Sequence, residues 1–201
     1  MIKNFIFDFG NVLAEFYPEK LTAPYVEDPD MRKQISEIVF DRSFWDGLDD
    51  GSVSDEDARA EIRKRISGDM QDVAIKVYDN WIENLTPVPH MQKLVEDIKK
   101  AGGKLFILSN ISIGFAEGYG KVKWIKELFS SFDGLVFSGT INKVKPNKDI
   151  FEYLLNKYNI KADETIFIDD SKKNVLGAED VGIKGYLFDG DADKLRKDIG
   201  I

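Results

Sequence analysis

Four groups of polar residues follow apolar runs of the sequence, and their residue types could do chemistry together. In chain order they are Asp8 in Phe-Asp-Phe-Gly-Asn-Val, Ser109-Asn110 in Phe-Ile-Leu-Ser-Asn, Lys145-Pro146 in Lys-Val-Lys-Pro-Asn, and Asp169-Asp170 in Ile-Phe-Ile-Asp-Asp-Ser. Each group alone is weak evidence, because an Asp or Ser after a strand more often caps a helix than performs catalysis. Helix capping alone does not explain four such groups with this mixture of carboxylate, hydroxyl, amide and ammonium side chains.

The elements that precede these groups are typical of buried strands. The continuous apolar runs are Ile2–Phe7, Lys104–Leu108, Leu135–Phe137, Thr165–Ile168 and Gly185–Phe188. Between them, apolar residues recur with helical spacing in 91–98, 150–158 and 175–181. Strands that alternate with helices predict an α/β fold, in which a parallel sheet is covered by helices on both faces. Because such sheets bind ligands at the carboxyl ends of their strands, the four polar groups should converge in one crevice.

The negative charge of the chain is concentrated in one segment. Between Glu19 and Thr86 there are 17 acidic and 9 basic residues, a net charge of −8, and the remainder of the chain is neutral. Apolar stripes of helical spacing fall in 31–39, 58–66 and 73–81, and no strand pattern accompanies them. This composition predicts a small all-helical domain at 18–86, inserted after the first strand of a core formed by 1–17 and 87–201.

Two local features of the acidic segment carry more detailed predictions. Ser54 with Asp57 three residues later is close to a capping box, which predicts a helix that begins after Ser54. The acidic stretch Asp46–Asp57 lacks the spacing of an EF-hand calcium loop and is predicted to be a solvated turn followed by a charged helix N-terminus.

Composition excludes several classes of function. The 201 residues contain no cysteine and one histidine, which excludes thiolate nucleophiles, cysteine-ligated metals and a multi-histidine metal site. A net charge of −8 argues against a protein that binds nucleic acid or anionic membranes. The chain shows neither an export signal nor 18 uninterrupted apolar residues, so a cytoplasmic location is expected.

The motifs and their order resemble the haloacid dehalogenase-like hydrolase superfamily, in the branch whose helical cap is inserted after the first strand. The matching residues are Asp8 as nucleophile, Ser109 with Asn110 as phosphate-binding residues, Lys145 as the third-motif lysine, and Asp169 with Asp170 as the fourth-motif acidic pair. The resemblance implies a Rossmann-like core, an all-helical cap domain, and Mg²⁺-dependent hydrolysis of phosphate monoesters through an aspartyl-phosphate.

The chemistry of these residue types agrees with that activity. A carboxylate can accept a phosphoryl group and release it to water in a second step. Both steps crowd negative charge, so a cation is needed. The resemblance implies that Mg²⁺ is held by Asp8, Asp170 and the Gly10 carbonyl, with Asp169 either a further ligand or a residue that supports the ligands. It also implies that Lys145 neutralises the nucleophile and the phosphate.

The main departure from the phosphatase pattern lies at position 10. The family's phosphatases have a second aspartate two residues after the nucleophile, which acts as general acid and then as base, whereas this chain has Gly10. General acid–base catalysis contributes about 10²–10⁴-fold to rate. Bacterial relatives that share Asp-x-Gly-Asn-Val, including α-glucose-1-phosphate phosphatases, are nevertheless phosphatases. In addition, Asn174 lies where many relatives carry a further acidic residue.

Three functions remain open. The favoured one is a phosphatase of a small phosphorylated metabolite of sugar type, because an acidic cap would repel highly charged substrates. The second is a catalytically weak or non-catalytic binding module that kept the site and lost the acid at position 10. The third, less favoured, is a 2-haloacid dehalogenase, whose pattern has tyrosine at position 10 and needs no Mg²⁺-binding acidic pair.

Overall fold

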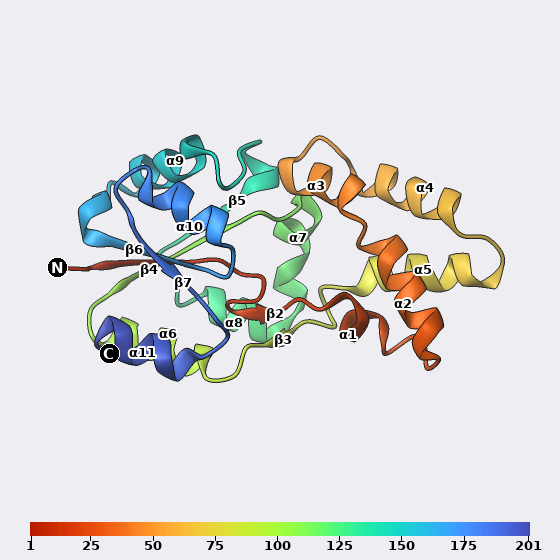
Figure 1. The fold of residues 1–201 in the computed structure, drawn as a ribbon, viewed down its shortest axis with the longest axis horizontal. Coiled ribbons are helices and arrows are strands. Elements are labelled where there is room, and N and C mark those ends of the chain that lie inside the picture. Colours follow the sequence, from red (N-terminus) through yellow and green to blue (C-terminus); the bar gives the residue numbers. More distant parts are fainter.

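The computed structural model describes residues 1–201 and contains a five-stranded sheet with helices on both faces (Figure 1). The strands lie in the order β5-β4-β1-β6-β7, and every neighbouring pair is parallel. Their bounds are β1 Asn4–Phe7, β4 Lys104–Ser109, β5 Gly134–Phe137, β6 Thr165–Asp169 and β7 Lys184–Leu187. The predicted α/β fold is confirmed, and each predicted strand is present within two residues of its expected limits.

Eleven α-helices and three short 3₁₀ turns connect or flank these strands. The helices are α1 Pro18–Thr22, α2 Pro29–Val39, α3 Arg42–Asp50, α4 Asp55–Arg65, α5 Asp69–Asn80, α6 Met91–Lys100, α7 Ile113–Gly118, α8 Lys123–Phe129, α9 Lys148–Tyr158, α10 Lys172–Glu179 and α11 Ala192–Ile199. The 3₁₀ turns are η1 Tyr119–Lys121, η2 Ser138–Thr140 and η3 Ala162–Glu164. None of the helices is long and apolar enough to cross a membrane.

Alternate side chains of each central strand enter different hydrophobic cores. On β1, Phe5 and Phe7 pack in the larger core with α6 and α11, whereas Ile6 packs in the smaller core with α9 and α10. All three side chains are buried, which is why this strand reads as a continuous apolar run. The outer strand β7 differs from its prediction, because it forms an edge and its side chains are exposed or half-buried.

Helices α1 to α5 form a second layer of structure beyond the ends of the strands (Figure 1). The chain passes between this group and the sheet twice, at β2 (Ala14–Glu15) and β3 (Thr86–Pro87), and these two short strands pair antiparallel. Ser54 forms the predicted capping box with Asp57 at the start of α4. Helices α1 and α3 were not predicted from the sequence.

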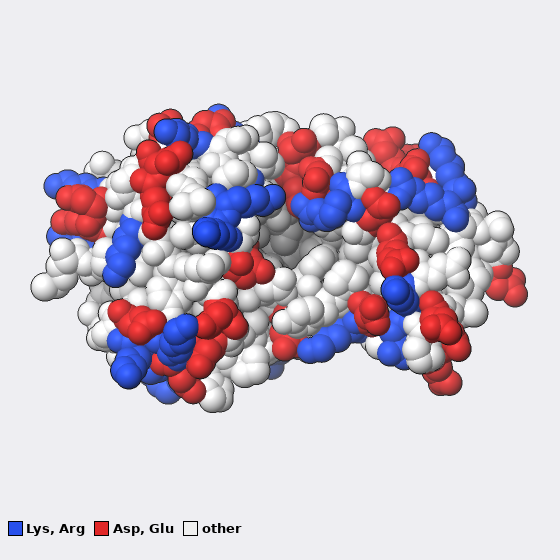
Figure 2. Space-filling model, in the orientation of Figure 1, with Lys and Arg blue, Asp and Glu red and all other residues white.

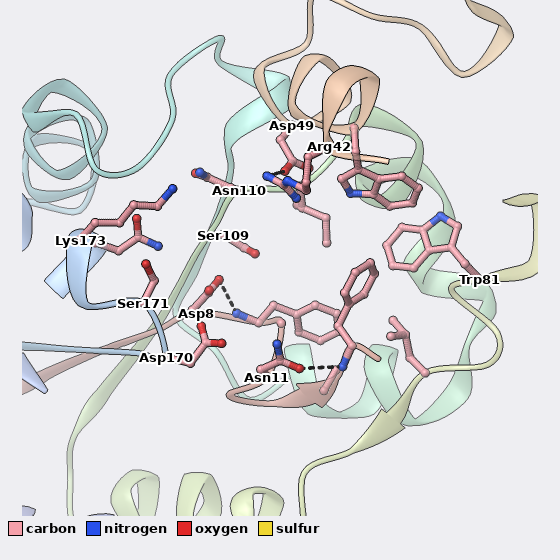
Figure 3. Close-up of a pocket in the computed structure, with 18 residues that line it drawn as sticks. Asp8, Asn11, Arg42, Asp49, Trp81, Ser109, Asn110, Asp170, Ser171 and Lys173 are labelled. Carbon is pink, nitrogen blue, oxygen red and sulfur yellow. Dashed lines mark hydrogen bonds and ion pairs between the residues drawn. The ribbon is translucent and has the colours of Figure 1, made fainter. Parts of the chain in front are cut away.

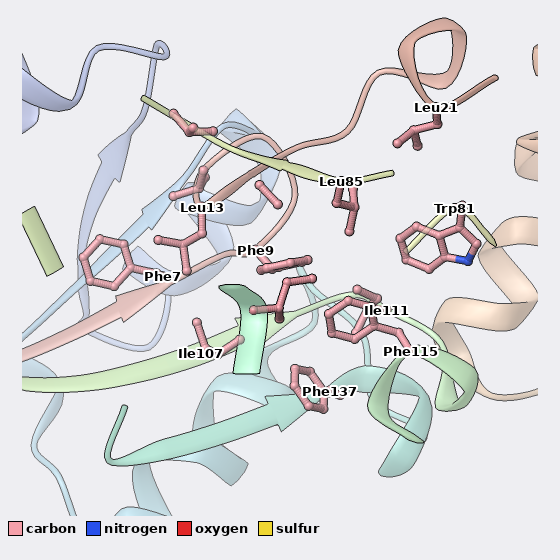
Figure 4. Close-up of a cluster of buried hydrophobic side chains, with 14 of the residues drawn as sticks. Phe7, Phe9, Leu13, Leu21, Trp81, Leu85, Ile107, Ile111, Phe115 and Phe137 are labelled. Atoms are coloured by element: carbon pink, nitrogen blue, oxygen red, sulfur yellow. The ribbon is translucent and has the colours of Figure 1, made fainter. Parts of the chain in front are cut away.

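The larger hydrophobic core continues from the sheet into the helical group (Figure 4). Phe9, just after β1, has its ring centroid 5.0 Å from that of Phe115 on α7, and Phe115 stacks on Trp81 at 5.8 Å. Trp81 in turn contacts Trp45 on α3. This chain of aromatic contacts anchors α3 and α5 above the carboxyl ends of the strands, where the polar residues gather.

Candidate active site

The strand ends bring most of the predicted site residues to one pocket. Asp8 follows β1, Ser109 ends β4, and Asp170 follows β6, and β4 and β6 are the two neighbours of β1 in the sheet. These three residues, with Gly10 and Asn110, line a cavity of about 250 Å³ (Figure 3). The surface is hollowed between the sheet and helices α1–α5, with basic and acidic side chains on its rim (Figure 2). Crevices at the point where strand order diverges are the usual ligand sites of such sheets.

Lys145 lies beneath the pocket and connects two of the carboxylates. Its Nζ is 2.9 Å from Asp8 Oδ1 and 2.7 Å from Asp169 Oδ2, and its side chain is fully buried. Although burial opposes its charge, the carboxylates of Asp8 and Asp169 hold the pKa of Lys145 above its ordinary value. Burial raises the pKa of Asp8, with Lys145 opposing this effect and Asp169 reinforcing it. The Asp8 carboxylate is therefore oriented by a fixed cation, which also lies close enough to neutralise an anion bound to it.

Three carboxylates form a group suited to a divalent cation. One oxygen from each of Asp8, Asp169 and Asp170 lies within 4.8 Å of the others. With the Lys145 ammonium among them, the ionised groups carry a net charge of −2, which one divalent cation would balance. Oxygen donors in a compact carboxylate group match the preference of Mg²⁺. The Oδ1 atom of Asn174 is buried at this site without a hydrogen-bond partner. This oxygen could therefore accept a hydrogen bond from a water molecule bound to the cation.

Asp169 and Asp170 have different environments. Asp169 is fully buried and accepts hydrogen bonds from Lys145 Nζ, the Ser171 backbone N–H at 2.8 Å and Asn174 Nδ2 at 3.1 Å. Asp170 is exposed in the pocket, where desolvation and the Asp169 charge raise its pKa. These hydrogen bonds orient Asp169 within the protein, whereas Asp170 presents its carboxylate to the cavity.

The two polar residues that end β4 also differ in their contacts. The Ser109 hydroxyl is directed into the pocket near Asp8 (Figure 3). The Asn110 side chain bonds instead to the backbone of Lys145, accepting from its N–H at 2.8 Å and donating to its carbonyl at 3.0 Å. Asn110 therefore positions the segment that carries Lys145, and its predicted phosphate contact would have to come from its backbone N–H.

Gly10 lines the pocket, and neither its backbone conformation nor its neighbours require a glycine there. Its φ is not positive, and a Cβ built on it would have one neighbour, Phe16 Cβ at 3.9 Å, an ordinary van der Waals contact. A side chain would therefore fit at position 10, so the absence of the family's acidic residue there does not follow from backbone conformation or crowding.

The cap side of the pocket contains functional candidates that sequence reasoning missed. Arg42, Trp45 and Asp49 project from α3, and Trp81 follows α5 (Figure 3). The prediction that the acidic stretch from position 46 is a solvated turn is wrong for Asp49, which is 5% exposed. The turn lies only at 51–54, because α3 extends to Asp50 and buries Asp49 against the sheet layer.

Comparison with known families agrees with this geometry. A family model described as haloacid dehalogenase-like hydrolase matches residues 51–187. The chain belongs to this family. The resemblance seen in the motifs is confirmed at family level, and the five-stranded parallel sheet with a helical cap is the fold expected for haloacid dehalogenase-like hydrolases.

Two curated relatives that align with most of this chain are named as phosphatases. The sesquiterpene phosphatase astK of Aspergillus oryzae is 24% identical over 180 residues, which cover 90% of this chain and 86% of the relative. A D-ribitol-5-phosphate phosphatase of Bacteroides thetaiotaomicron is 23% identical over 205 residues, covering 96% and 95%. A solved haloacid dehalogenase-family enzyme of Bacteroides thetaiotaomicron, in complex with magnesium and inorganic phosphate, has a TM-score of 0.71 and 21% identity over 97% of this chain and 99% of that one. This chain is a hydrolase of the same family.

Proposed function

We propose that this protein is a Mg²⁺-dependent phosphatase of small organic monophosphates that works through an aspartyl-phosphate on Asp8. The observation that carries the proposal is the Asp8 carboxylate, which opens on a pocket while Lys145 holds it from below at 2.9 Å. The acidic group beside it and the phosphatase names of the relatives support the same reaction.

The residues of the chain divide the work of the two chemical steps. Asp8 attacks the phosphorus atom, and the bond from phosphorus to the leaving oxygen breaks. Lys145 neutralises charge on Asp8 and on the phosphoryl group, and Ser109 donates a hydrogen bond to a phosphoryl oxygen. Water then attacks the phosphoryl group and restores the Asp8 carboxylate. Magnesium at this site would supply positive charge to offset the negative charge crowded between Asp8 and the phosphoryl group.

We assign the residues that would hold magnesium by their environments. Asp8, Gly10 and Asp170 line the pocket, and the two carboxylates and the Gly10 carbonyl are proposed as direct ligands. The carboxylate of Asp169 accepts hydrogen bonds from Lys145, from the Ser171 backbone N–H and from Asn174. We therefore propose that Asp169 orients the site. A partner of this kind fixes the geometry of a metal site from behind.

The substrate class follows from the cap, which we propose to be residues 18–86, over a core of 1–17 and 87–201. A net charge of −8 on this segment disfavours polyphosphates and oligonucleotides. The pocket wall contains Phe16, Trp45, Trp81 and Leu85, which suit the carbon skeleton of a sugar, a polyol or a more apolar alcohol. The Asp-x-Gly-Asn-Val motif, similar to that of α-glucose-1-phosphate phosphatases, favours the sugar phosphates.

The test is phosphate release from a panel of monophosphates, with and without Mg²⁺, for wild type and Asp8→Asn. The panel includes hexose and pentitol phosphates, isoprenyl phosphates, 4-nitrophenyl phosphate, nucleoside triphosphates and 2-chloropropionate, with chloride release followed for the last. Turnover that needs both Mg²⁺ and Asp8 supports the proposal. Absence of turnover on every member favours the non-catalytic module, and chloride release without Mg²⁺ favours the dehalogenase.

A further inference from the structure

The reaction proposed above needs a proton donor for the leaving oxygen, and position 10 supplies none. The charged or acidic side chains that line the pocket are Asp8, Arg42, Asp49, Asp170 and Lys173. Asp8 is the nucleophile and Asp170 a proposed metal ligand. Arg42 and Lys173 are cations, suited to hold the negative charge of a substrate rather than to accept a proton from water. Asp49 is the remaining carboxyl group.

Asp49 lies on the side of the pocket where a leaving group would project. In Figure 3 it faces the cavity from α3, across from Asp8, with Ser109 between them. A phosphoryl group held at Asp8 and Ser109 directs its leaving oxygen away from the nucleophile, because attack and departure are in line. That direction is toward the cap, where α3 carries Asp49.

The carboxyl group of Asp49 is available to a ligand. Its Oδ2 atom lies 3.4 Å from Arg42 Nη2, and Oδ1 accepts no hydrogen bond from the protein. The side chain is 7% exposed, and it borders the cavity. One oxygen is therefore oriented by Arg42, and the other is free to exchange a proton within the pocket.

The backbone that carries Asp49 is fixed to the sheet layer. Ser138 Oγ on η2 donates a hydrogen bond to the Asp49 carbonyl, and Asn142 Nδ2 donates to the Asp50 carbonyl at 3.0 Å. Gly51 ends α3 with a φ of 80°, and a Cβ there would lie 2.6 Å from the Gly139 carbonyl oxygen. These contacts hold the last turn of α3 close against η2, so Asp49 is positioned before a substrate arrives.

The environment of Asp49 also keeps its proton near neutral pH. Burial raises the pKa of Asp49 to about 7, the Arg42 charge opposes this effect, and the Asp46 and Asp8 carboxylates reinforce it. A carboxyl group that is partly protonated at neutral pH can donate a proton in one step and accept one in the next.

We propose that Asp49 of the cap is the general acid and base of the reaction, in place of the carboxyl group absent from position 10. This inference rests on the phosphatase function proposed above. As the bond from phosphorus to the leaving oxygen breaks, that oxygen takes the proton from Asp49 and departs as an alcohol. The resulting Asp49 carboxylate then takes a proton from the water that attacks the aspartyl-phosphate, which restores both Asp8 and protonated Asp49.

The experiment compares Asp49→Asn with Asp46→Asn, the same substitution at an exposed position of α3 that contacts the same partner, Arg42. The probes are 4-nitrophenyl phosphate and an alkyl phosphate that the wild type hydrolyses, both saturated with Mg²⁺ and followed by rapid mixing. Because 4-nitrophenolate leaves without protonation, Asp49→Asn should release about one equivalent per enzyme at nearly the wild-type rate and then turn over slowly. Its first turnover on the alkyl phosphate should fall about 10²–10⁴-fold, and Asp46→Asn should resemble the wild type.

A second variant separates proton transfer from a positional role. Since a side chain fits at position 10, Gly10→Asp placed in the Asp49→Asn protein should restore turnover of the alkyl phosphate at least tenfold. Equal losses on both substrates with no burst and no rescue, or no loss at all, would overturn the role of Asp49. Wild-type protein without Mg²⁺-dependent and Asp8-dependent phosphatase activity would instead overturn the proposed function itself.

Discussion

Replacing Asp49 by asparagine should stabilise the protein above neutral pH, although it removes a residue from the pocket. Burial raises the pKa of Asp49 from its ordinary 3.8 to about 7, against the opposing charge of Arg42. The folded state therefore binds a proton more tightly than the unfolded state does. Stability that this group contributes is present at low pH and is lost as the pH rises from about 4 through 7.

The size of the effect follows from the shift. Each pKa unit is worth about 1.4 kcal/mol, so the ionised Asp49 costs the folded state about 4 kcal/mol at pH 8. Between pH 5 and pH 8 the wild type should lose about 3 kcal/mol of unfolding free energy that Asp49→Asn retains, because the amide does not ionise. For a chain of 201 residues, 3 kcal/mol corresponds to a difference of about 6–12 °C in Tm.

The assay is urea unfolding at pH 5, 6, 7 and 8, in EDTA so that divalent cations do not contribute. Asp46→Asn is the matched control, since its side chain is 64% exposed and its loss should change stability by less than about 0.5 kcal/mol at every pH. Parallel pH profiles for the wild type and Asp49→Asn would show that Asp49 ionises as an ordinary carboxyl group. That result would also remove one support for its role as an acid.

Three further outcomes concern the residues around the nucleophile. Asp8→Asn should abolish phosphate release while its circular dichroism spectrum stays that of the wild type; residual turnover by the pure variant would exclude Asp8 as nucleophile. Asp170→Asn should raise the Mg²⁺ concentration needed for half-maximal activity, and an unchanged titration midpoint would show that Asp170 is not a ligand. Lys145→Met should destabilise the protein by about 3–5 kcal/mol in urea unfolding at pH 8, because it leaves buried Asp8 and Asp169 unpaired. The exposed pair of Lys143 with Asp149 provides the control, and an equal loss in Lys143→Met would contradict the buried ion pair.

The sheet and the strand-end residues were predictable because their signals are local. A strand covered on both faces is apolar through its middle, so β1, β4 and β6 are visible as runs of consecutive apolar residues. The residue that follows such a run is placed at the carboxyl end of the strand by chain geometry alone. Asp8 and Asp170 therefore reach the pocket wherever the helices pack.

The roles of Lys145 and Asn110 depend on contacts between distant parts of the chain. The sequence indicates that Lys145 follows the third strand, and it does not indicate that the side chain is fully buried between two carboxylates. The phosphate contact expected of Asn110 involves its backbone N–H, whereas its side-chain amide bonds to backbone atoms 35 residues away. The sequence alone does not indicate the hydrogen-bond partner of an amide side chain that follows a strand.

Asp49 shows where reasoning from composition fails. The stretch that contains it is acidic, and an acidic stretch is usually solvated, so a turn was predicted. Helical signals were nevertheless present: Asp41 caps α3, Gly51 ends it, and Trp45 precedes Asp49 by four residues, which puts both on one helix face. Trp45 packs among the aromatic side chains of the cap, whereas the Asp49 carbonyl accepts a hydrogen bond from the Ser138 hydroxyl on η2, 89 residues later. Helical periodicity indicates that Asp49 and Trp45 share a face of α3. The docking of the cap on the sheet removes the Asp49 carboxyl group from water, and this burial raises its pKa.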